Sequence, residues 1–487
     1  MQETESLSFR IGGAWVTGES PGDREDRNPA DQRDVLARYR LLNRAQMAQV
    51  MDAAEDGQRR WRAMGALARA AVLRDAAARL RADKSAIART ITRENGKLLA
   101  EAGVEVDKSA DFLEYYAGIA RTPGGGFVAD GRPETTTTVR TEPIGIVAMI
   151  TPWNDPMLTP ARKLGPALIS GNAVVLKPAR DTPLAAWHIT RALVEAGLPD
   201  GVLNLVMTDH ATFDETVLGD RRLAGVTFTG STGVGLQLGR RLGGTNIRLQ
   251  TEMGGKNASV ILADADLDGA VATVVAAAFG QAGQRCTATS RLIVEQQVHD
   301  AVLERLTTAV RALTPAPGLQ EGAGMCPLVS TDHRDAVLAH LADAREDGAR
   351  IVAGGDKPDD AALAHGCFVL PTLIADVTPD MRIWREEAFG PVLAVRAVAS
   401  FDEAVEAVND SDYGLAAALF TRDLAHAQRF IDRAEVGQVA INLPTTGWDV
   451  HQPFGGFKQS GSAFKEQGEE GLRFYTRVKT AAVRSAI

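Results

Sequence analysis

Apolar positions recur every three or four residues over much of the first 120 residues. The runs AQMAQVMDAAEDGQRRW (45–61) and ARAAVLRDAAARLRAD (68–83) have this spacing, which predicts amphipathic helices. We therefore expect the first part of the chain to be mostly helical. The Gly- and Pro-rich run TPGGGFVADGRP (122–133) indicates a break, and the alternating run TTTTVRTEPIG (135–145) predicts an extended strand.

From residue 144 to 260 the pattern changes to short apolar runs that alternate with helical ones. Such alternation predicts βαβ units and a parallel sheet with both faces covered, and ligands bind such sheets beyond the carboxyl ends of the strands. The expected strands are GIVAMIT, AVVLKP, VLNLVMT, GVTFTG and IRLQTEMGG, and the expected helices are MLTPARKLGPALISG, PLAAWHITRALVEAG and STGVGLQLGRRLG.

A second α/β stretch is expected over residues 255–440. It includes SRLIVEQQ, AVLERLTTAVRAL and DEAVEAVNDSDYGLAAALFT. The tail GLRFYTRVKTAAVRS (471–485) alternates between apolar and polar residues, so it predicts a final strand that needs a partner. We find no internal repeat and no low-complexity tract, and the predicted fold class is α/β.

Composition narrows the class of protein. The 487 residues are 45% hydrophobic and 24% charged, which is typical of a soluble globular protein. A net charge of −9 argues against nucleic acid as a partner, and no run approaches the roughly 20 apolar residues of a membrane span. The start, MQETESLSFR, has no apolar segment typical of a secretory signal. We therefore expect a cytoplasmic protein.

The chain has three cysteines, Cys286, Cys326 and Cys367. Their odd number and wide spacing fit a reducing compartment and predict neither a disulfide framework nor a metal site. Cys286 stands out because it lies beside Arg285 in GQRCTATS, and a nearby positive charge lowers the pKa of a thiol. Cys286 is thus a candidate nucleophile, the alternative being a buried, inert cysteine; for the other two we expect the inert role.

A nucleophilic thiol needs a base and a group that stabilises the oxyanion. Glu252 follows a predicted strand and precedes two glycines, so it is a candidate base, or alternatively a solvated strand-end carboxylate. Asn154 in TPWNDP follows another strand, and its amide is a candidate oxyanion donor together with the backbone N–H of Cys286. The alternative for Asn154 is an ordinary turn residue.

Two further runs suit a phosphate-bearing ligand. FTGSTGVG (228–235) places Gly230, Ser231 and Gly235 between a strand and a helix, whose N-terminus attracts anions. This run is not the usual dinucleotide fingerprint, so it is weak evidence alone. AVVLKPAR (173–180) ends a strand with Lys177, a candidate donor to ribose hydroxyls or phosphate.

Taken together, these motifs resemble the aldehyde dehydrogenase superfamily. The matching runs occur in the family's order over about residues 8–480: TPWNDP, GNAVVLKPA, FTGSTGVG, EMGGK, GQRC, EEAFGPV, YGLAAALFT and PFGGFKQSG. The resemblance implies oxidation of an aldehyde to a carboxylic acid with NAD or NADP. It implies that Cys286 forms a thiohemiacetal and then a thioester, that Glu252 activates the hydrolytic water, and that Lys163 in ARKLGPAL lies near the site with a less defined role.

The resemblance also implies a cofactor site. Lys177 would hold the adenosine ribose, Ser231 would contact the pyrophosphate, and Glu387 and Phe389 would hold the nicotinamide ribose and ring. The remaining residues carried over to this site are Thr151, Pro152, Trp153, Ala179, Arg180, Gly230, Gly235 and Gly254.

The resemblance implies three structural parts. We expect a Rossmann-like cofactor-binding domain from residues 1–124 and 144–252, and an α/β catalytic domain from 253–440. Residues 125–143 and 470–487 would supply strands of a small oligomerisation domain, which implies a homo-oligomer, either a dimer or a tetramer.

Arg180 departs from the family pattern, because family members that use NAD commonly have a glutamate at this position. A guanidinium would pair with the 2′-phosphate of NADP, whereas a carboxylate would repel it. We therefore expect NADP to be accepted and favoured over NAD, unless Arg180 points into solvent.

The residues expected to line the substrate tunnel also depart from the family pattern. Asp155, Thr159 and Arg162 share a predicted helix face, and Arg285 precedes the nucleophile, so the tunnel is expected to be polar and basic. Two arginines suit a carboxylate-bearing aldehyde, and TPWNDPMLTPARKL with LPTTGWDVHQPFGGF resembles the branch that oxidises 2-oxoglutarate semialdehyde (2,5-dioxopentanoate). Alternatively, an Arg162–Asp155 ion pair would leave the tunnel neutral.

The remaining expectations are as follows. Thr287 and Phe454 complete the predicted substrate residues, with Phe454 and Trp448 flanking the tunnel mouth. SAFKEQGEEG (462–471) carries one extra residue relative to the family, near the oligomer tail, and we expect no effect on chemistry.

Alternative functions remain open: a succinate semialdehyde-type or benzaldehyde-type substrate, CoA or phosphate as acyl acceptor, and a non-catalytic structural relative. The presence of Glu252, Cys286 and Asn154 argues against the last.

Overall fold

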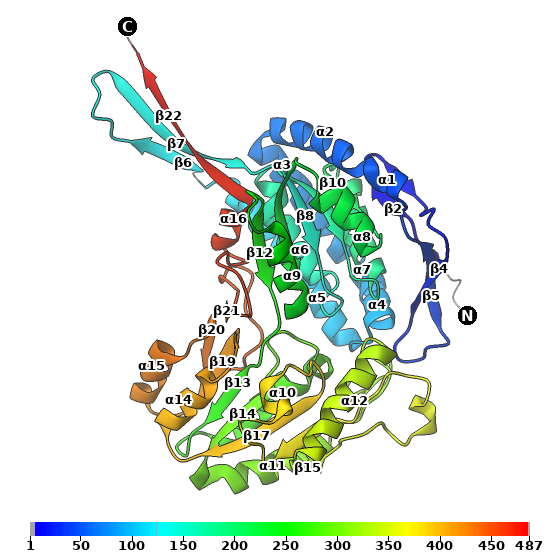
Figure 1. The fold of residues 1–487 in the computed structure, drawn as a ribbon, viewed down its shortest axis with the longest axis vertical. Helices are drawn as coiled ribbons and strands as arrows, with labels where there is room; N and C mark the ends of the chain where they lie inside the picture. Colours follow the sequence, from blue (N-terminus) through cyan, green and yellow to red (C-terminus); the bar gives the residue numbers. More distant parts are fainter. Residues whose placement is uncertain (1–4, 123, 486–487) are drawn as a thin grey trace.

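Two seven-stranded sheets organise the chain into two lobes (Figure 1). The computed structural model describes residues 5–122 and 124–485, so residues 1–4, 123 and 486–487 of the predicted domains lie outside the described residues. One apolar core runs from Leu7 to Met253 with Phe474 and Tyr475, and a second runs from Ala258 to Ala440. On this basis we propose a boundary between the two domains near residue 252, as the sequence predicts.

The first sheet has a parallel centre, as the alternating pattern predicts. Its order is β12 (Arg248–Glu252), β11 (Leu223–Thr229), β8 (Ile146–Ile150), β9 (Ala173–Lys177), β10 (Leu203–Leu205), β2 (Phe9–Ile11) and β3 (Ala14–Val16). The first five strands are mutually parallel, and β2 and β3 add an antiparallel edge. Because both faces are covered, β8 and β9 are almost wholly buried and apolar.

Helices cover this sheet on both sides (Figure 1). They are α2 (Val50–Ala63), α3 (Gly65–Ala82), α4 (Lys84–Asn95), α5 (Leu99–Ile119), α6 (Leu158–Ile169), α7 (Pro183–Glu195) and α9 (Thr232–Leu242). α5 packs against α3, α4 and α6. None of the helices in residues 5–122 and 124–485 is long and apolar enough to cross a membrane.

The second sheet follows the same pattern. Its order is β15 (Arg350–Ala353), β16 (Thr372–Ala375), β17 (Val392–Val398), β14 (Arg291–Glu295), β13 (Ala258–Ile261), β19 (Ala416–Phe420) and β20 (Gln438–Ile441), parallel except for β15. Its helices are α10 (Leu267–Phe279), α11 (His299–Arg311), α12 (Thr331–Glu346), α14 (Phe401–Asn409) and α15 (Leu424–Arg433).

A long arm projects from the first lobe (Figure 1). It consists of β22 (Thr476–Arg484), β7 (Thr135–Pro143) and β6 (Gly125–Val128), with β22 and β7 paired antiparallel over their whole length. The two predicted strands therefore pair with each other. The arm leaves apolar side chains exposed at Phe127, Val478 and Val483.

Local structure departs from the predicted patterns at three places. Helices from Arg44 to Ile119 make the first 120 residues mostly helical, as expected, but residues 5–40 form short strands, including β1 (Glu5–Ser6), β4 (Asp23–Arg27) and β5 (Val35–Arg40) of a separate three-stranded sheet. Strand β6 lies within the Gly- and Pro-rich run that indicated a break, although it fits the strands expected over 125–143, because it pairs with β7. The tail begins with a helix, α16 (Glu470–Tyr475), whose buried Phe474 and Tyr475 join the first core before β22 starts.

Candidate active site

Asn154 lies in the turn that links β8 to α6. It is buried and lines a pocket of about 340 Å³ together with Cys286. The pocket collects residues that follow β8, β11 and β12 in the first lobe and residues of the second lobe. The site thus lies where the carboxyl ends of three parallel strands face the second lobe.

Cys286 follows an unusual backbone turn. Gln281, Ala282 and Gly283 have φ values of 51°, 53° and 70°, in the left-handed region that non-glycine residues adopt at a cost. This turn ends the helical segment and places the half-buried Cys286 in both the 340 Å³ pocket and a second pocket of about 190 Å³. A thiol shared by two pockets can meet a ligand from each side.

The 340 Å³ pocket holds many of the residues expected at the cofactor. Pro152, Trp153, Gly230, Ser231, Gly254, Glu387 and Phe389 line it. Thr151, Lys177, Ala179, Arg180 and Gly235 are not among its lining residues. Lys177 lies 5.9 Å from the ring of Phe213, and burial lowers the pKa of its amine.

The pocket walls fit a nicotinamide dinucleotide. A Cβ on Gly254 would lie 2.2 Å from a carboxylate oxygen of Glu387, so only glycine permits this close approach. A Cβ on Gly235 would likewise meet the sulfur of Met253 at 2.3 Å, so small residues keep the helix N-terminus close to the strand ends. The buried hydroxyl of Thr229, which lines the pocket, has no hydrogen-bond partner in the protein, which leaves a polar atom for a ligand.

An aromatic group at this pocket was not predicted. The ring of His333 in α12 packs against Trp153 at a tilt of 59°, with 5.1 Å between ring centroids, and its Nε2 lies 2.8 Å from the carbonyl oxygen of Phe389. Trp153 and Phe389 meet edge to face at 5.4 Å, and Phe389 has a φ of 53°. His333 therefore ties the two lobes together across the pocket, and the sequence around it, STDHRD, carries no signal of this role.

Burial controls the protonation of the site. It raises the pKa of the Cys286 thiol to about 12, and the cation of Arg162 opposes this shift. Burial also raises the pKa of Glu387 to about 7, although its carboxylate accepts a 2.9 Å hydrogen bond from the N–H of Gly255. In the absence of ligands the thiol is therefore protonated near neutral pH.

Glu252 is buried at the end of β12 and does not line either pocket. One of its carboxylate oxygens has no partner, and its pKa is raised well above the usual value by burial and then by the charge of Glu466, with Lys163 opposing.

Lys163 lies in a buried polar cluster behind Glu252. Its amine donates to the hydroxyl of Thr227 at 2.7 Å, to the amide oxygen of Gln250 at 3.2 Å and to Glu466. Burial lowers the pKa of Lys163. Glu466 of the segment 462–471, for which we expected no effect on chemistry, contacts both Lys163 and Arg162.

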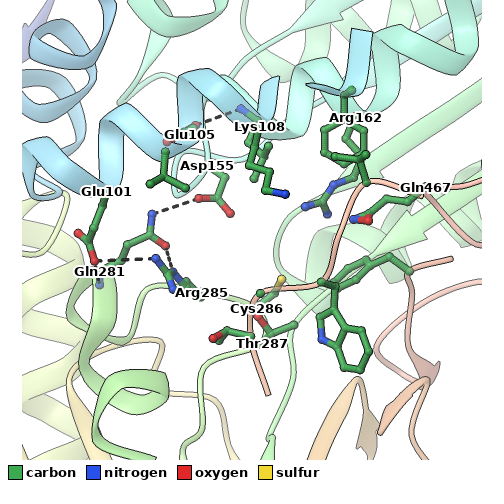
Figure 2. Close-up of a pocket in the computed structure, with 18 residues that line it drawn as sticks. Glu101, Glu105, Lys108, Asp155, Arg162, Gln281, Arg285, Cys286, Thr287 and Gln467 are labelled. Atoms are coloured by element: carbon green, nitrogen blue, oxygen red, sulfur yellow. Dashed lines mark hydrogen bonds and ion pairs between the residues drawn. The ribbon is translucent and has the colours of Figure 1, made fainter. Parts of the chain in front are cut away.

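The 190 Å³ pocket contains the residues expected at the substrate. Asp155, Arg162, Arg285, Thr287 and Phe454 line it with Cys286 (Figure 2). Trp448 lines it as well. Thr159 instead lines the 340 Å³ pocket, which Asp155 and Arg162 also border.

Arg162 does not pair with Asp155, so the neutral-tunnel alternative does not hold in the form we considered. Its guanidinium lies 3.6 Å from a carboxylate oxygen of Glu466 and 4.9 Å from the centroid of Phe454. The buried Nε of Arg162 has no partner. Arg162 therefore keeps a free donor beside Cys286.

The other cations of this pocket are more strongly held. Arg285 donates from Nε to the side chain of Gln281 and lies 3.8 Å from Glu101. Lys108 of α5, which the sequence did not single out, points into the pocket in Figure 2 and pairs with Asp449 at 2.7 Å. Because Lys108 lies on a partly exposed face of a long helix, the sequence around it does not indicate this role.

Arg180 is exposed and lies 3.4 Å from Asp181 and 3.5 Å from Asp332. Its side chain is thus available to a ligand at the end of β9, with two carboxylates nearby.

Comparison with known proteins shows which family this chain is similar to. The model of the aldehyde dehydrogenase family matches residues 15–481. The chain is 41% identical to an alpha-ketoglutarate semialdehyde dehydrogenase of Haloferax volcanii, over 98% of this chain and 99% of the relative. It is 37% identical to a 2,5-dioxopentanoate dehydrogenase of Saccharolobus solfataricus, over 96% and 97%. A crystal structure of betaine aldehyde dehydrogenase from Staphylococcus aureus in complex with NAD+ superposes with a TM-score of 0.95 at 32% identity, over 99% of this chain and 95% of that one.

Proposed function

The chain belongs to the aldehyde dehydrogenase family, and from that premise we propose that it oxidises a small acidic semialdehyde of the 2-oxoglutarate semialdehyde type. It is an oxidoreductase that acts on aldehydes with a nicotinamide cofactor. The pocket beside Cys286 is lined by Lys108, Arg162 and Arg285 and by the carboxylates of Glu101, Glu105 and Asp155. The observation that carries the substrate class is the Nε of Arg162, a cationic donor of this pocket that has no partner. The names of two relatives, which report the same kind of substrate, support it.

In the first step the sulfur of Cys286 attacks the aldehyde carbon, and the carbonyl oxygen becomes an oxyanion. The amide of Asn154 and the backbone N–H of Cys286 donate to that oxygen. The thiol must lose its proton first, and the cation of Arg162 favours the thiolate. This use of a covalent intermediate divides a difficult oxidation into easier steps.

Bound NAD or NADP would supply the acceptor for a hydride, and loss of that hydride from the thiohemiacetal carbon would leave a thioester on Cys286. The residues that would hold the cofactor are Pro152, Trp153, Gly230, Ser231, Gly254, Glu387 and Phe389, with Lys177, Ala179 and Arg180 at the end of β9. In the last step Glu252, rotated toward the pocket and deprotonated, takes a proton from water. The resulting hydroxide attacks the thioester carbon, and the acid leaves as the sulfur of Cys286 is restored.

The cofactor preference and the assembly are further parts of this proposal. Arg180 favours NADP, because a guanidinium pairs with a 2′-phosphate, although its side chain is exposed, as in the alternative considered for it, and lies 3.5 Å from Asp332. The arm with its exposed Phe127, Val478 and Val483 favours a homo-oligomer, since apolar side chains on a projecting sheet are normally covered. We also propose a cytoplasmic location, from the scarcity of cysteine.

A panel of aldehydes tests the substrate class. Acidic semialdehydes, aliphatic, aromatic and amino aldehydes are compared with NAD and NADP by following the absorbance of the reduced cofactor. We expect the highest kcat/KM for an acidic semialdehyde. A higher value for a neutral or cationic aldehyde contradicts the proposed substrate class while leaving the family assignment intact.

A further inference from the structure

Lys97 is a fully buried lysine in the segment that joins α4 to α5. Its amine donates 2.5 Å to Glu105, 2.8 Å to the backbone carbonyl of Asn154 and 3.2 Å to Asp155. Its side chain is 0% exposed, and that of Glu105 is 3% exposed. A buried ion pair with this many partners costs desolvation and seldom adds stability over an apolar pair, which points to a role for Lys97 beyond stability.

The local backbone is arranged to turn Lys97 inward. Gly96 ends α4 with a φ of 95°, a left-handed conformation that favours glycine. A Cβ on Gly96 would lie 2.8 Å from Pro327 and 2.9 Å from Pro29, so a side chain at this position would also collide. The turn directs Lys97 toward the first lobe's strand ends instead of into solvent.

Asn95 and Lys97, together with Glu105 of α5, form hydrogen bonds with the backbone of the turn that carries Asn154. Asn95 donates 2.8 Å to the carbonyl of Trp153, and Lys97 donates 2.8 Å to the carbonyl of Asn154 itself. Glu105 accepts hydrogen bonds of 2.8 and 3.0 Å from the N–H groups of Met157 and Leu158, where α6 begins. These four contacts, to the backbone of residues 153, 154, 157 and 158, fix the turn from which the Asn154 amide projects.

The cluster also reaches the loop that carries the nucleophile. Asp155 accepts from Lys97 and, with the same oxygen, from the side chain of Gln281 at 3.2 Å. Glu101 accepts a 2.8 Å bond from the N–H of Gln281. Figure 2 shows Glu101, Glu105, Asp155 and Gln281 grouped on one side of the pocket, with Cys286 beyond them.

We propose that Lys97 is a positioning residue of the reaction: by holding the carbonyl of Asn154 and the carboxylate of Asp155, it sets the separation between the Asn154 amide and the sulfur of Cys286. Asp155, which we expected to bind substrate, is on this proposal the link between the two loops. The inference rests on the proposed mechanism, in which Asn154 stabilises the oxyanion.

The test uses p-nitrophenyl acetate as well as an aldehyde. The sulfur of Cys286 attacks the ester carbonyl and passes through the same oxyanion; p-nitrophenolate leaves, and water hydrolyses the thioester to acetate. This reaction needs neither a cofactor nor the correct aldehyde. A wild-type protein that hydrolyses the ester but oxidises no acidic semialdehyde would therefore overturn the proposed substrate without affecting the test of Lys97.

Lys97→Met is expected to lower the rate of p-nitrophenolate release about 10- to 100-fold, since loss of an oxyanion donor costs about 10²–10³ and small misplacements cost a comparable part. The affinity for the oxidised cofactor, measured by quenching of protein fluorescence, is expected to change less than about threefold.

The discriminating experiment is a double-mutant cycle. In an Asn154→Ala background, Lys97→Met is expected to lower the rate less than about threefold further, because a positioning residue has nothing left to position.

Arg69→Met is the matched control. Arg69 is a buried cation of α3 that also donates to a backbone carbonyl, that of Ile169 at 3.0 Å, but at the far end of α6. Arg69→Met is expected to lower stability while leaving the rate of ester hydrolysis within about twofold.

If Lys97→Met fails to fold, Asn95→Ala replaces Lys97→Met in the cycle, because this change removes the contact to Trp153 without leaving an unpaired buried charge. A loss of about three- to tenfold in the rate of ester hydrolysis is then expected. Equal losses in both backgrounds, or no loss in either, overturn the proposal.

Discussion

Arg162 gives the sharpest test of how the pocket selects its substrate. Its Nε is buried without a partner, and its guanidinium lies 3.6 Å from Glu466. Replacing it by methionine keeps most of the aliphatic volume against Phe454 while removing the charge. Glu466 stays paired, because the amine of Lys163 also donates to it. Arg162→Met therefore removes a cation without leaving a lone buried carboxylate.

The size of the effect follows from the lost bond. A hydrogen bond to a charged group contributes about 1.5–3 kcal/mol. At about 1.4 kcal/mol per factor of ten, kcat/KM for an acidic semialdehyde is expected to fall about 10- to 150-fold. A neutral aldehyde of the same length is expected to lose less than about tenfold, because it loses only the influence of Arg162 on the thiol. Arg285→Met is expected to have a smaller effect on the acidic substrate, since Arg285 is already held by Gln281 and Glu101.

The assay is the initial rate of cofactor reduction with each aldehyde at saturating cofactor. With Arg162→Met we expect KM to rise more for the acidic aldehyde than for the neutral one. An equal loss for acidic and neutral aldehydes would show that Arg162 acts only on Cys286 or on the fold, and an unchanged KM for the acidic aldehyde would refute a carboxylate contact.

Three other predictions follow from the charges around the site. Because burial holds the thiol pKa of Cys286 at about 12, alkylation by iodoacetamide without cofactor should accelerate about tenfold per pH unit over about pH 7–9; a plateau in this range contradicts the raised pKa. Lys163→Met removes a cation that lowers the pKa of Glu252, so the acidic limb of the kcat–pH profile should move to higher pH when deacylation limits the rate; a shift to lower pH contradicts the role of that cation. Arg180→Glu should lower kcat/KM for NADP at least about tenfold relative to NAD, and an unchanged ratio shows that Arg180 does not meet the 2′-phosphate.

Much of the fold could be predicted because its elements are amphipathic or uniformly apolar. Strands β8 and β9 and helices α6 and α7 lie where the alternating pattern places them. The strands before residue 40 were missed because they are two to six residues long, and β4 (Asp23–Arg27) consists only of charged residues. So short a charged run has no period that reveals a strand.

The candidate site was predictable only in its motif-bearing part. Lys97 contacts Asn154 across 57 positions of the chain, and Glu466 contacts Lys163 across 303. Contacts over such separations depend on how α5 and the segment after β21 (Phe457–Lys458) pack, which local patterns do not encode. The ENGK run at residues 94–97 offered one signal, a lysine directly after a glycine that ends a helix.

We propose that oxidation proceeds through an acyl group on Cys286 that Glu252 helps to remove. The intact mass of Glu252→Gln, measured after mixing with an acidic semialdehyde and oxidised cofactor, tests this proposal. We expect about one equivalent of reduced cofactor and a mass increase of one acyl group, mapped to Cys286 and absent when Cys286→Ala is added. An unmodified Cys286 during turnover, or dehydrogenase activity in Cys286→Ala, would contradict it.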